Sequence, residues 1–134
     1  MFEQLLGLAS LLLVGIVVYV AIRFRFGKKK LDQQKFRQQW NRIGQLYRDP
    51  KTIVYSVIEA DKLLDNALKQ LGFKGETMGE RLKSAAPSLT DNDAIWAAHK
   101  LRNRLVHEDG QPKKSEIRMA IKAFEQALRR LGAL

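Results

Sequence analysis

Hydrophobic positions beyond residue 30 recur at the spacing of an α-helix, and no stretch alternates with the period of two that marks a half-buried strand. This spacing predicts four long amphipathic helices, over residues 31–48, 50–71, 91–107 and 115–131. The last of them shows the most regular pattern, because apolar residues follow the positions i, i+4, i+7, i+11 and i+14: Ile117, Ile121, Phe124, Leu128 and Leu131.

Capping residues predict where these helices begin and end. Asp49 suits an N-cap and Pro50 suits the first position of the helix over 50–71, while Gly72 suits its C-terminal stop. Thr77 and Glu80 have the spacing of a capping box, which predicts a short helix before the loop that follows. Four amphipathic helices with short connections make an antiparallel four-helix bundle over residues 31–134 the expected architecture of an all-α protein.

The chain opens with a different pattern, because no charged residue occurs between Leu5 and Ile22. These 18 residues would form a helix of about 27 Å, against about 30 Å for the hydrocarbon core of a bilayer. We therefore expect residues 1–22 to be a single transmembrane anchor with the bilayer as its partner. A cleaved signal peptide needs a positive start and a small-residue cleavage site, whereas this chain has Glu3. A buried core helix is the remaining alternative.

A basic segment over residues 23–30 follows the apolar run and carries five positive side chains: Arg23, Arg25, Lys28, Lys29 and Lys30. Positive charge on one flank of a span predicts that this side faces the cytoplasm. The expected location is therefore the cytoplasmic (inner) membrane, with the C-terminal domain inside the cell. The same five charges would attract anionic lipid headgroups.

Composition excludes several classes of site. The 134 residues include no cysteine, which excludes disulfides, cysteine-ligated zinc, iron–sulfur clusters and a cysteine nucleophile. Two histidines are too few for an all-histidine metal centre, so neither a metal nor a cofactor is expected. The net charge of +10 includes +5 from residues 23–30, which leaves the helical domain only moderately basic.

The helix over residues 91–107, with Asp91 as its expected N-cap, combines apolar and polar positions in an unusual way. Its apolar face consists of Ile95, Ala98, Leu105 and Val106. Arg102 lies in the middle of that face, so it must pair, extend to the surface or face something other than solvent. A carboxylate on the preceding long helix, Asp61 or Asp65, would serve as its partner. His99, Asn103 and His107 form a polar stripe beside this face at i, i+4 and i+8.

The six residues from Arg102 to His107 read R-N-x-x-x-H, which resembles the signature of the HEPN domain family. The surrounding stretch AHKLRNRLVHE and the upstream stretch GETMGERLK resemble small prokaryotic HEPN-like proteins, and the resemblance covers roughly residues 50–131. It implies an all-α domain that is often dimeric. Many members of the family are metal-independent endoribonucleases, while others have lost catalysis and only bind.

For this chain the resemblance implies that Arg102 and His107 are the catalytic pair, with Asn103 as the polar residue after the arginine. A histidine suits the removal of the 2′-hydroxyl proton of RNA, and an arginine suits the phosphate. The products would carry 2′,3′-cyclic phosphate ends. Nearby cations that would hold RNA phosphates are Lys100, Arg104, Lys113 and Lys114.

Five residues on a regular helix separate Arg102 from His107 by about 140°. Either the helix unwinds near Glu108, Asp109 and Gly110, or a homodimer formed through the third and fourth long helices brings two such pairs together. Two functions are therefore expected. One is a non-catalytic adaptor or RNA-associated module that dimerises or recruits a protein partner, in which Arg102 and His107 hold the bundle together. The other is a metal-independent endoribonuclease.

Overall fold

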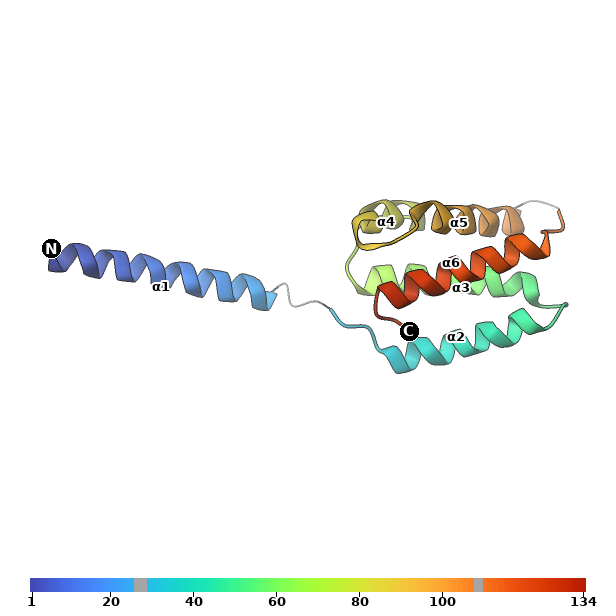
Figure 1. Cartoon of the computed structure of the whole chain (residues 1–134), viewed down its shortest axis with the longest axis horizontal. Helices are drawn as coiled ribbons and strands as arrows, with labels where there is room; N and C mark the ends of the chain where they lie inside the picture. Colours follow the sequence, from blue (N-terminus) through green and yellow to red (C-terminus); the bar gives the residue numbers. More distant parts are fainter. Residues whose placement is uncertain (26–28, 108–109) are drawn as a thin grey trace.

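The computed structural model describes residues 1–25, 29–107 and 110–134, with the side chains at positions 3, 5 and 22–25 left undescribed. Every regular element in these ranges is a helix, which confirms the all-α part of the predicted fold class (Figure 1). Six α-helices and one 3-10 turn follow in chain order: α1 (Phe2–Arg25), α2 (Gln33–Arg48), α3 (Ile53–Gln70), α4 (Met78–Ala85), η1 (Ala86–Ser88), α5 (Asn92–His107) and α6 (Lys114–Arg130).

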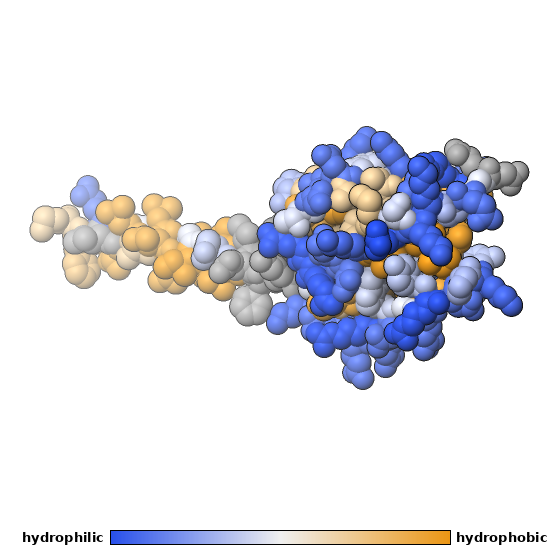
Figure 2. Space-filling model, turned by 45° about the vertical axis from the view of Figure 1, so that its right-hand side comes forward, coloured by the Kyte–Doolittle hydropathy of each residue, from blue (hydrophilic) through white to orange (hydrophobic). Residues whose placement is uncertain are grey.

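Helix α1 lies apart from the bundle and exposes apolar side chains along its length (Figures 1 and 2). Within the described residues, no helix has both the length and the apolar character needed to cross a membrane, so the predicted transmembrane anchor is wrong. The uncharged run reaches about 27 Å, short of the about 30 Å hydrocarbon core, and the helix around it also includes Glu3, Arg23 and Arg25. In the basic segment predicted over 23–30, Lys28 lies outside the described residues, whereas Lys29 and Lys30 are exposed.

Helices α2, α3, α5 and α6 form the predicted helical bundle, and α4 covers one end of it (Figure 1). Consecutive long helices run antiparallel. Short connections join α2 to α3 and α5 to α6, whereas residues 71–91, which include α4 and η1, connect α3 to α5. Helix α3 is central, since it packs against α2, α4, α5 and α6. Inward-pointing side chains of α5 therefore meet α3 as well as α6.

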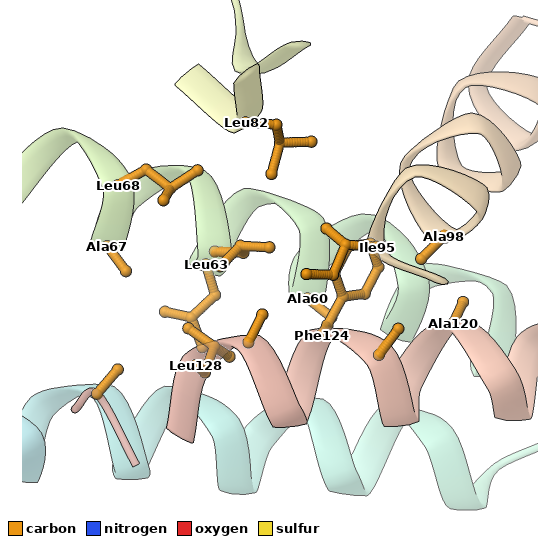
Figure 3. Close-up of a cluster of buried hydrophobic side chains, with 14 of the residues drawn as sticks. Ala60, Leu63, Ala67, Leu68, Leu82, Ile95, Ala98, Ala120, Phe124 and Leu128 are labelled. Carbon is orange, nitrogen blue, oxygen red and sulfur yellow. The ribbon is translucent and has the colours of Figure 1, made fainter. Parts of the chain in front are cut away.

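The core lies between α3 and α6 and is closed by α2, α4 and α5 (Figure 3). Phe124 and Leu128 of α6 are completely buried, at positions that the helical spacing predicted, and Leu64 of α3 is completely buried as well. Burying one such side chain contributes about 1.5–3 kcal/mol. Six alanines of the long helices are buried in this core: Ala60, Ala67, Ala98, Ala120, Ala123 and Ala127. Small side chains at these positions let the long helices pack closely around α3.

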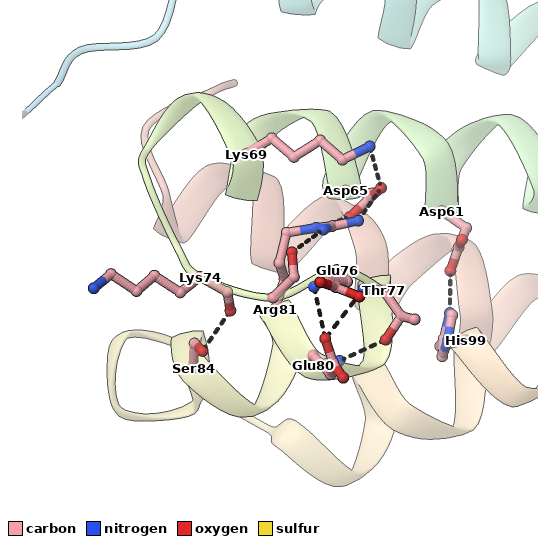
Figure 4. Close-up of polar contacts among 11 residues, drawn as sticks. Asp61, Asp65, Lys69, Lys74, Glu76, Thr77, Glu80, Arg81, Ser84 and His99 are labelled. Carbon is pink, nitrogen blue, oxygen red and sulfur yellow. Dashed lines mark hydrogen bonds and ion pairs between the residues drawn. The ribbon is translucent and has the colours of Figure 1, made fainter.

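Three predicted helix boundaries are confirmed. Gly72 has a φ of +84°, its N–H donates to Lys69 O, and the Phe73 N–H donates to Leu68 O, so α3 ends in a Schellman motif. Asp91 caps α5, because its carboxylate accepts the Ala94 N–H at 3.2 Å. The capping box of α4 is also present (Figure 4).

The expected start of the second long helix is wrong by three residues, because α3 begins at Ile53 rather than at Pro50. The Asp49 carboxylate accepts the Lys51 N–H at 2.9 Å, and the Thr52 N–H donates to Asp49 O at 3.0 Å. Asp49 therefore closes a turn that contains Pro50 instead of capping a helix. The Thr52 hydroxyl then donates to Leu46 O, which ties this turn back to α2.

Candidate functional site

Arg102 lies at the contact between α5 and α3, and its partner is Asp61, one of the two carboxylates named from the sequence. Arg102 Nε is 3.5 Å from Asp61 Oδ2, and 3% of the Asp61 side chain is exposed, against 32% of the Arg102 side chain. The Arg102 Nη1 atom donates to Asn103 Oδ1 at 3.0 Å. Arg102 Nε is buried and has no hydrogen-bond partner within the described part of the chain, so its attraction to Asp61 is an ion pair without a close hydrogen bond.

The same carboxylate also holds His99. His99 Nδ1 lies 2.8 Å from Asp61 Oδ1, and both residues are buried (Figure 4). Because an ionised carboxylate can only accept, Nδ1 carries the proton in this contact. The Trp96 ring packs edge-on against the His99 ring, with centroids 5.9 Å apart. Asp61 therefore cross-links α3 to two successive turns of α5, and this cluster of Asp61, His99 and Arg102 is called the Asp61 cluster below.

The second carboxylate, Asp65, lies one turn further along α3 and binds α4 instead. Arg81 Nε and Nη2 donate to the two oxygens of Asp65 at 2.6 and 3.0 Å, and Lys69 Nζ is 3.0 Å away (Figure 4). Burial alone would raise the pKa of the Asp65 carboxyl, but the hydrogen bonds from Arg81 and Lys69 hold that pKa below its ordinary value. Arg81 also donates to Gly75 O, so it fixes the loop before α4 to α3.

His107 is the last residue of α5, and it is exposed. Helix α5 is continuous from Asn92 to His107, so the side chains of Arg102 and His107 leave it about 140° apart. The alternative of an unwound last turn falls on Glu108 and Asp109, which lie outside the described residues. Within one chain, the structure therefore brings Arg102 to His99 and Asp61, and it does not place His107 in that contact.

The four cations predicted to hold RNA phosphates do not surround Arg102. Lys100 and Arg104 border a groove between α5 and α6, and Arg104 Nη2 lies 2.7 Å from Glu116 Oε1. Lys113 and Lys114 lie at the start of α6, where the Lys113 N–H donates to the other Glu116 oxygen at 2.9 Å. The hydrogen bonds from Arg104 and Lys113 lower the pKa of the Glu116 carboxyl. RNA binding by these four residues stays a prediction.

The groove between α5 and α6, called the α5/α6 groove below, has a volume of about 560 Å³. Its floor is apolar and built mainly from small side chains: Ala94, Ala97, Ala98, Leu101, Ala120 and Ala123. Charged side chains of both signs border it: Asp91, Lys100, Arg104, Glu116 and Lys122. Met119 also lines this groove, with 68% of its surface exposed. Arg102 contacts α3 and does not line the groove.

No protein-family model, no curated protein and no solved structure matches this chain. The resemblance to HEPN domains therefore depends on the Arg102–His107 motif and on its place on α5 of a helical bundle. Among the residues that the structure describes, no three His, Asp or Glu side chains gather in a way that could hold a metal ion.

Two members of these polar contacts were not singled out as site residues from the sequence. His99 was noted only as part of a polar stripe, although its position three residues before Arg102 puts both side chains within about 60° on one face of a helix. Arg81 lies in the short helix after the capping box, and no apolar periodicity there marks it as inward-facing. Which arginine pairs with Asp61 and which with Asp65 depends on the register between α3 and its neighbours, and sequence spacing alone does not supply that register.

Proposed function

We propose that this chain is a HEPN-like adaptor that forms a homodimer through the α5/α6 groove and presents its remaining surfaces to a protein partner. The observation that carries the proposal is the groove itself, an apolar hollow bordered by an exposed methionine on a domain whose other large apolar side chains are mostly buried. Exposed apolar hollows of this kind favour association with another surface.

A second copy of the chain suits this groove in shape and charge. In a two-fold arrangement the same patch meets itself, so Met119 of each copy would insert between the alanines of the other, as a knob enters a hole. The border carries Lys100 and Lys122 together with Asp91 and Glu116, so each copy offers both signs of charge to its partner.

The position of the Asp61 cluster favours a non-catalytic adaptor and not an active site that two subunits share. Arg102 faces α3, whereas the groove lies between α5 and α6. A dimer formed through the groove therefore leaves the two Arg102 side chains on the outer sides of the assembly and does not join them. In the adaptor, Arg102 contributes to the fold by neutralising the buried Asp61 carboxylate.

The experiment that tests the adaptor is a mass measurement on the full chain by light scattering, in a mild detergent that covers α1, with the detergent mass subtracted. The chain of 15.4 kDa is expected at twice that mass. Ala97→Glu places a charge in the exposed part of the groove and is expected to give the monomer. Gln38→Glu, at an exposed position of α2, is the matched control and is expected to leave the dimer intact.

A monomeric wild-type chain at high concentration would contradict the proposal, as would an Ala97→Glu variant that stays dimeric. Circular dichroism must show the same helix content in all three proteins, so that a lost dimer reflects the groove and not unfolding.

A second candidate function is a metal-independent endoribonuclease that uses Arg102 and a histidine of α5. The observation that favours it is that about a third of the Arg102 side chain is exposed, one helical turn from His99 on α5. Cleavage of RNA in the presence of EDTA, with 2′,3′-cyclic phosphate ends, is the measurement that tests this candidate.

A further inference from the structure

Another hollow of the bundle, called the bundle-end pocket below, lies at the end nearest α1 (Figure 1). Four segments that are far apart in the sequence line it: residues 29–33, the segment just after α3, η1 and the end of α6. Gln33 Nε2 donates to Gly132 O at 3.1 Å, which ties the start of α2 to the end of α6. The pocket has a volume of about 1100 Å³, and none of the described residues that line it also lines the α5/α6 groove. It is therefore separate from the proposed dimer contact.

Three basic side chains line the bundle-end pocket: Lys29, Lys30 and Arg130. All three residues are exposed, and within the described part of the chain none of their side chains forms an ion pair or a hydrogen bond with the protein. Lys29 Nζ lies 3.9 Å from the place that a Cβ of Gly72 would occupy, which puts this ammonium group at the C-terminal end of α3. The pocket therefore carries three cations that no protein group has taken up.

The negative charge at this pocket is smaller than the positive charge. Among the described residues that line it, Asp32 is the only acidic one, and its Oδ1 atom already accepts the Lys35 N–H at 3.2 Å as the N-cap of α2. The C-termini of α3 and α6 each add about half a negative charge. Three full positive charges against about two negative ones leave about one positive charge, which suits a singly charged anion such as a phosphodiester.

The remaining wall of the pocket is largely apolar. Leu31 is buried, and three further apolar side chains are partly buried against the core: Leu71, Phe73 and Leu131. The volume of about 1100 Å³ is close to the upper end of the range of about 300–1,000 Å³ for small-molecule sites, so a free phosphate ion would fill little of it. Cations beside an apolar surface match an amphiphile, in which a charged headgroup is joined to an apolar chain.

The chain also places an apolar surface shortly before this pocket. Helix α1 ends at Arg25, four positions before Lys29, and it exposes large apolar side chains such as those of Leu11 and Leu12. Acyl chains next to a bound headgroup would cover such side chains and remove them from water, whereas a free phosphate ion would not. The position of the pocket therefore favours a phospholipid over free phosphate as the source of the anion.

We propose that the bundle-end pocket binds the phosphodiester headgroup of an anionic phospholipid. The Arg130 guanidinium donates two N–H groups to the phosphate oxygens, and Lys29 and Lys30 add two further positive charges. The first carbons of the acyl chains lie against Phe73 and Leu131. This site does not depend on the homodimer, so the failure of either proposal leaves the other standing.

The first arm of the test follows amide signals by NMR in the full chain, labelled with ¹⁵N-glycine and held in micelles of an uncharged detergent. Phosphatidylglycerol added to the micelles is expected to shift the signals of Gly72 and Gly132, which adjoin the pocket, and to leave that of Gly44 inside α2 unchanged. Phosphatidylcholine has a headgroup without net charge, and at least about 10-fold more of it should be needed for the same shift. Inorganic phosphate at the same concentration is expected to cause no shift.

The second arm asks whether the cations of the pocket hold the lipid. Arg130→Gln is expected to raise the half-saturating concentration of phosphatidylglycerol about fivefold, which corresponds to about 1 kcal/mol. Arg118→Gln is the matched control, because it makes the same exchange at an exposed position of the same helix outside the pocket. It is expected to change this concentration less than about 1.5-fold. An unchanged Gly44 signal in both variants shows that the bundle stays folded.

Three results would overturn the proposal. Phosphatidylglycerol that leaves the Gly132 signal in place would show that the pocket does not bind the headgroup. Inorganic phosphate that shifts Gly132 as strongly as phosphatidylglycerol would exclude the lipid as the specific ligand. Equal weakening by Arg130→Gln and Arg118→Gln, or an equal shift at Gly44, would indicate a diffuse attraction between a basic chain and anionic micelles and would exclude the pocket as the site.

Discussion

Asp61 Oδ1 and His99 Nδ1 lie 2.8 Å apart, although the two residues are separated by 38 positions in the chain. The second oxygen of the same carboxylate faces Arg102 Nε at 3.5 Å. The buried Asp61 side chain of α3 therefore contacts two turns of α5. These contacts hold one side of α5 against α3, and another side of α5 borders the α5/α6 groove. The predictions below follow from this arrangement and from the adjoining contacts of Asp65.

Removing the Asp61 charge should destabilise the bundle. Asp61→Asn leaves the partly exposed Arg102 without its counter-charge and replaces the charged acceptor of His99 by a neutral one, and we expect the free energy of unfolding to fall by about 2 kcal/mol. Urea unfolding followed by circular dichroism measures this change. Glu59→Gln removes an exposed carboxylate from the same helix and is expected to change stability by less than about 0.5 kcal/mol. Equal losses in the two variants would contradict the structural role of Asp61.

The contact between α3 and α4 should depend on Arg81. Arg81→Met keeps most of the side-chain volume but leaves Asp65 with Lys69 alone, and it also removes the hydrogen bond to Gly75 O. We expect a loss of about 2 kcal/mol in the free energy of unfolding, because a bidentate, partly buried pair is broken. A variant as stable as the wild type would show that this pair contributes nothing to the docking of α4.

The bundle should lose stability in acid, and the sign follows from Asp65. Its pKa is lower in the folded chain than in the unfolded chain, so the unfolded state binds more protons as the pH falls. The stabilisation is fully present above the unfolded pKa of about 4 and disappears as the pH drops through the folded pKa. Melting temperatures from pH 6 to pH 2.5 should fall less steeply for Asp65→Asn than for the wild type. Parallel curves for the two proteins would contradict the assignment of the loss of stability in acid to Asp65.

Two glycines should respond to alanine in opposite directions. Gly72 ends α3 with a φ of +84°, so Gly72→Ala strains the backbone and is expected to cost about 1 kcal/mol. Gly44 lies inside α2, where an added Cβ finds its nearest neighbour 4.0 Å away, so Gly44→Ala is expected to stabilise the chain by about 0.5–1 kcal/mol. Melting curves of the two variants measure these changes. Shifts of the melting temperature in the same direction for both variants would contradict the prediction.

Most of the bundle could be predicted from the sequence because apolar spacing and capping residues are local signals. The core positions Phe124 and Leu128 and the cap at Asp91 follow from them. The start of α3 was missed because Asp49 and Pro50 also fit a turn, and only the contacts of Thr52 decide between the two.

The candidate site was harder to predict because it depends on long-range register. Both Asp61 and Asp65 lie on the same face of α3, and the choice between them for Arg102 depends on how far α5 slides along α3. The motif drew attention to His107, whereas the residue that meets Arg102 at Asp61 is His99. The composition of the apolar run over residues 5–22 predicts a transmembrane helix, and that prediction is wrong.

The most direct test of the proposed homodimer is disulfide cross-linking across the α5/α6 groove, since the chain has no cysteine of its own. Full-length Met119→Cys and Ala97→Cys chains are mixed in detergent and oxidised briefly, and Gln38→Cys replaces Ala97→Cys in the control mixture. The account predicts rapid formation of the mixed Met119→Cys/Ala97→Cys dimer and a much slower reaction in the control. Equal rates in the two mixtures would contradict the groove as the dimer interface.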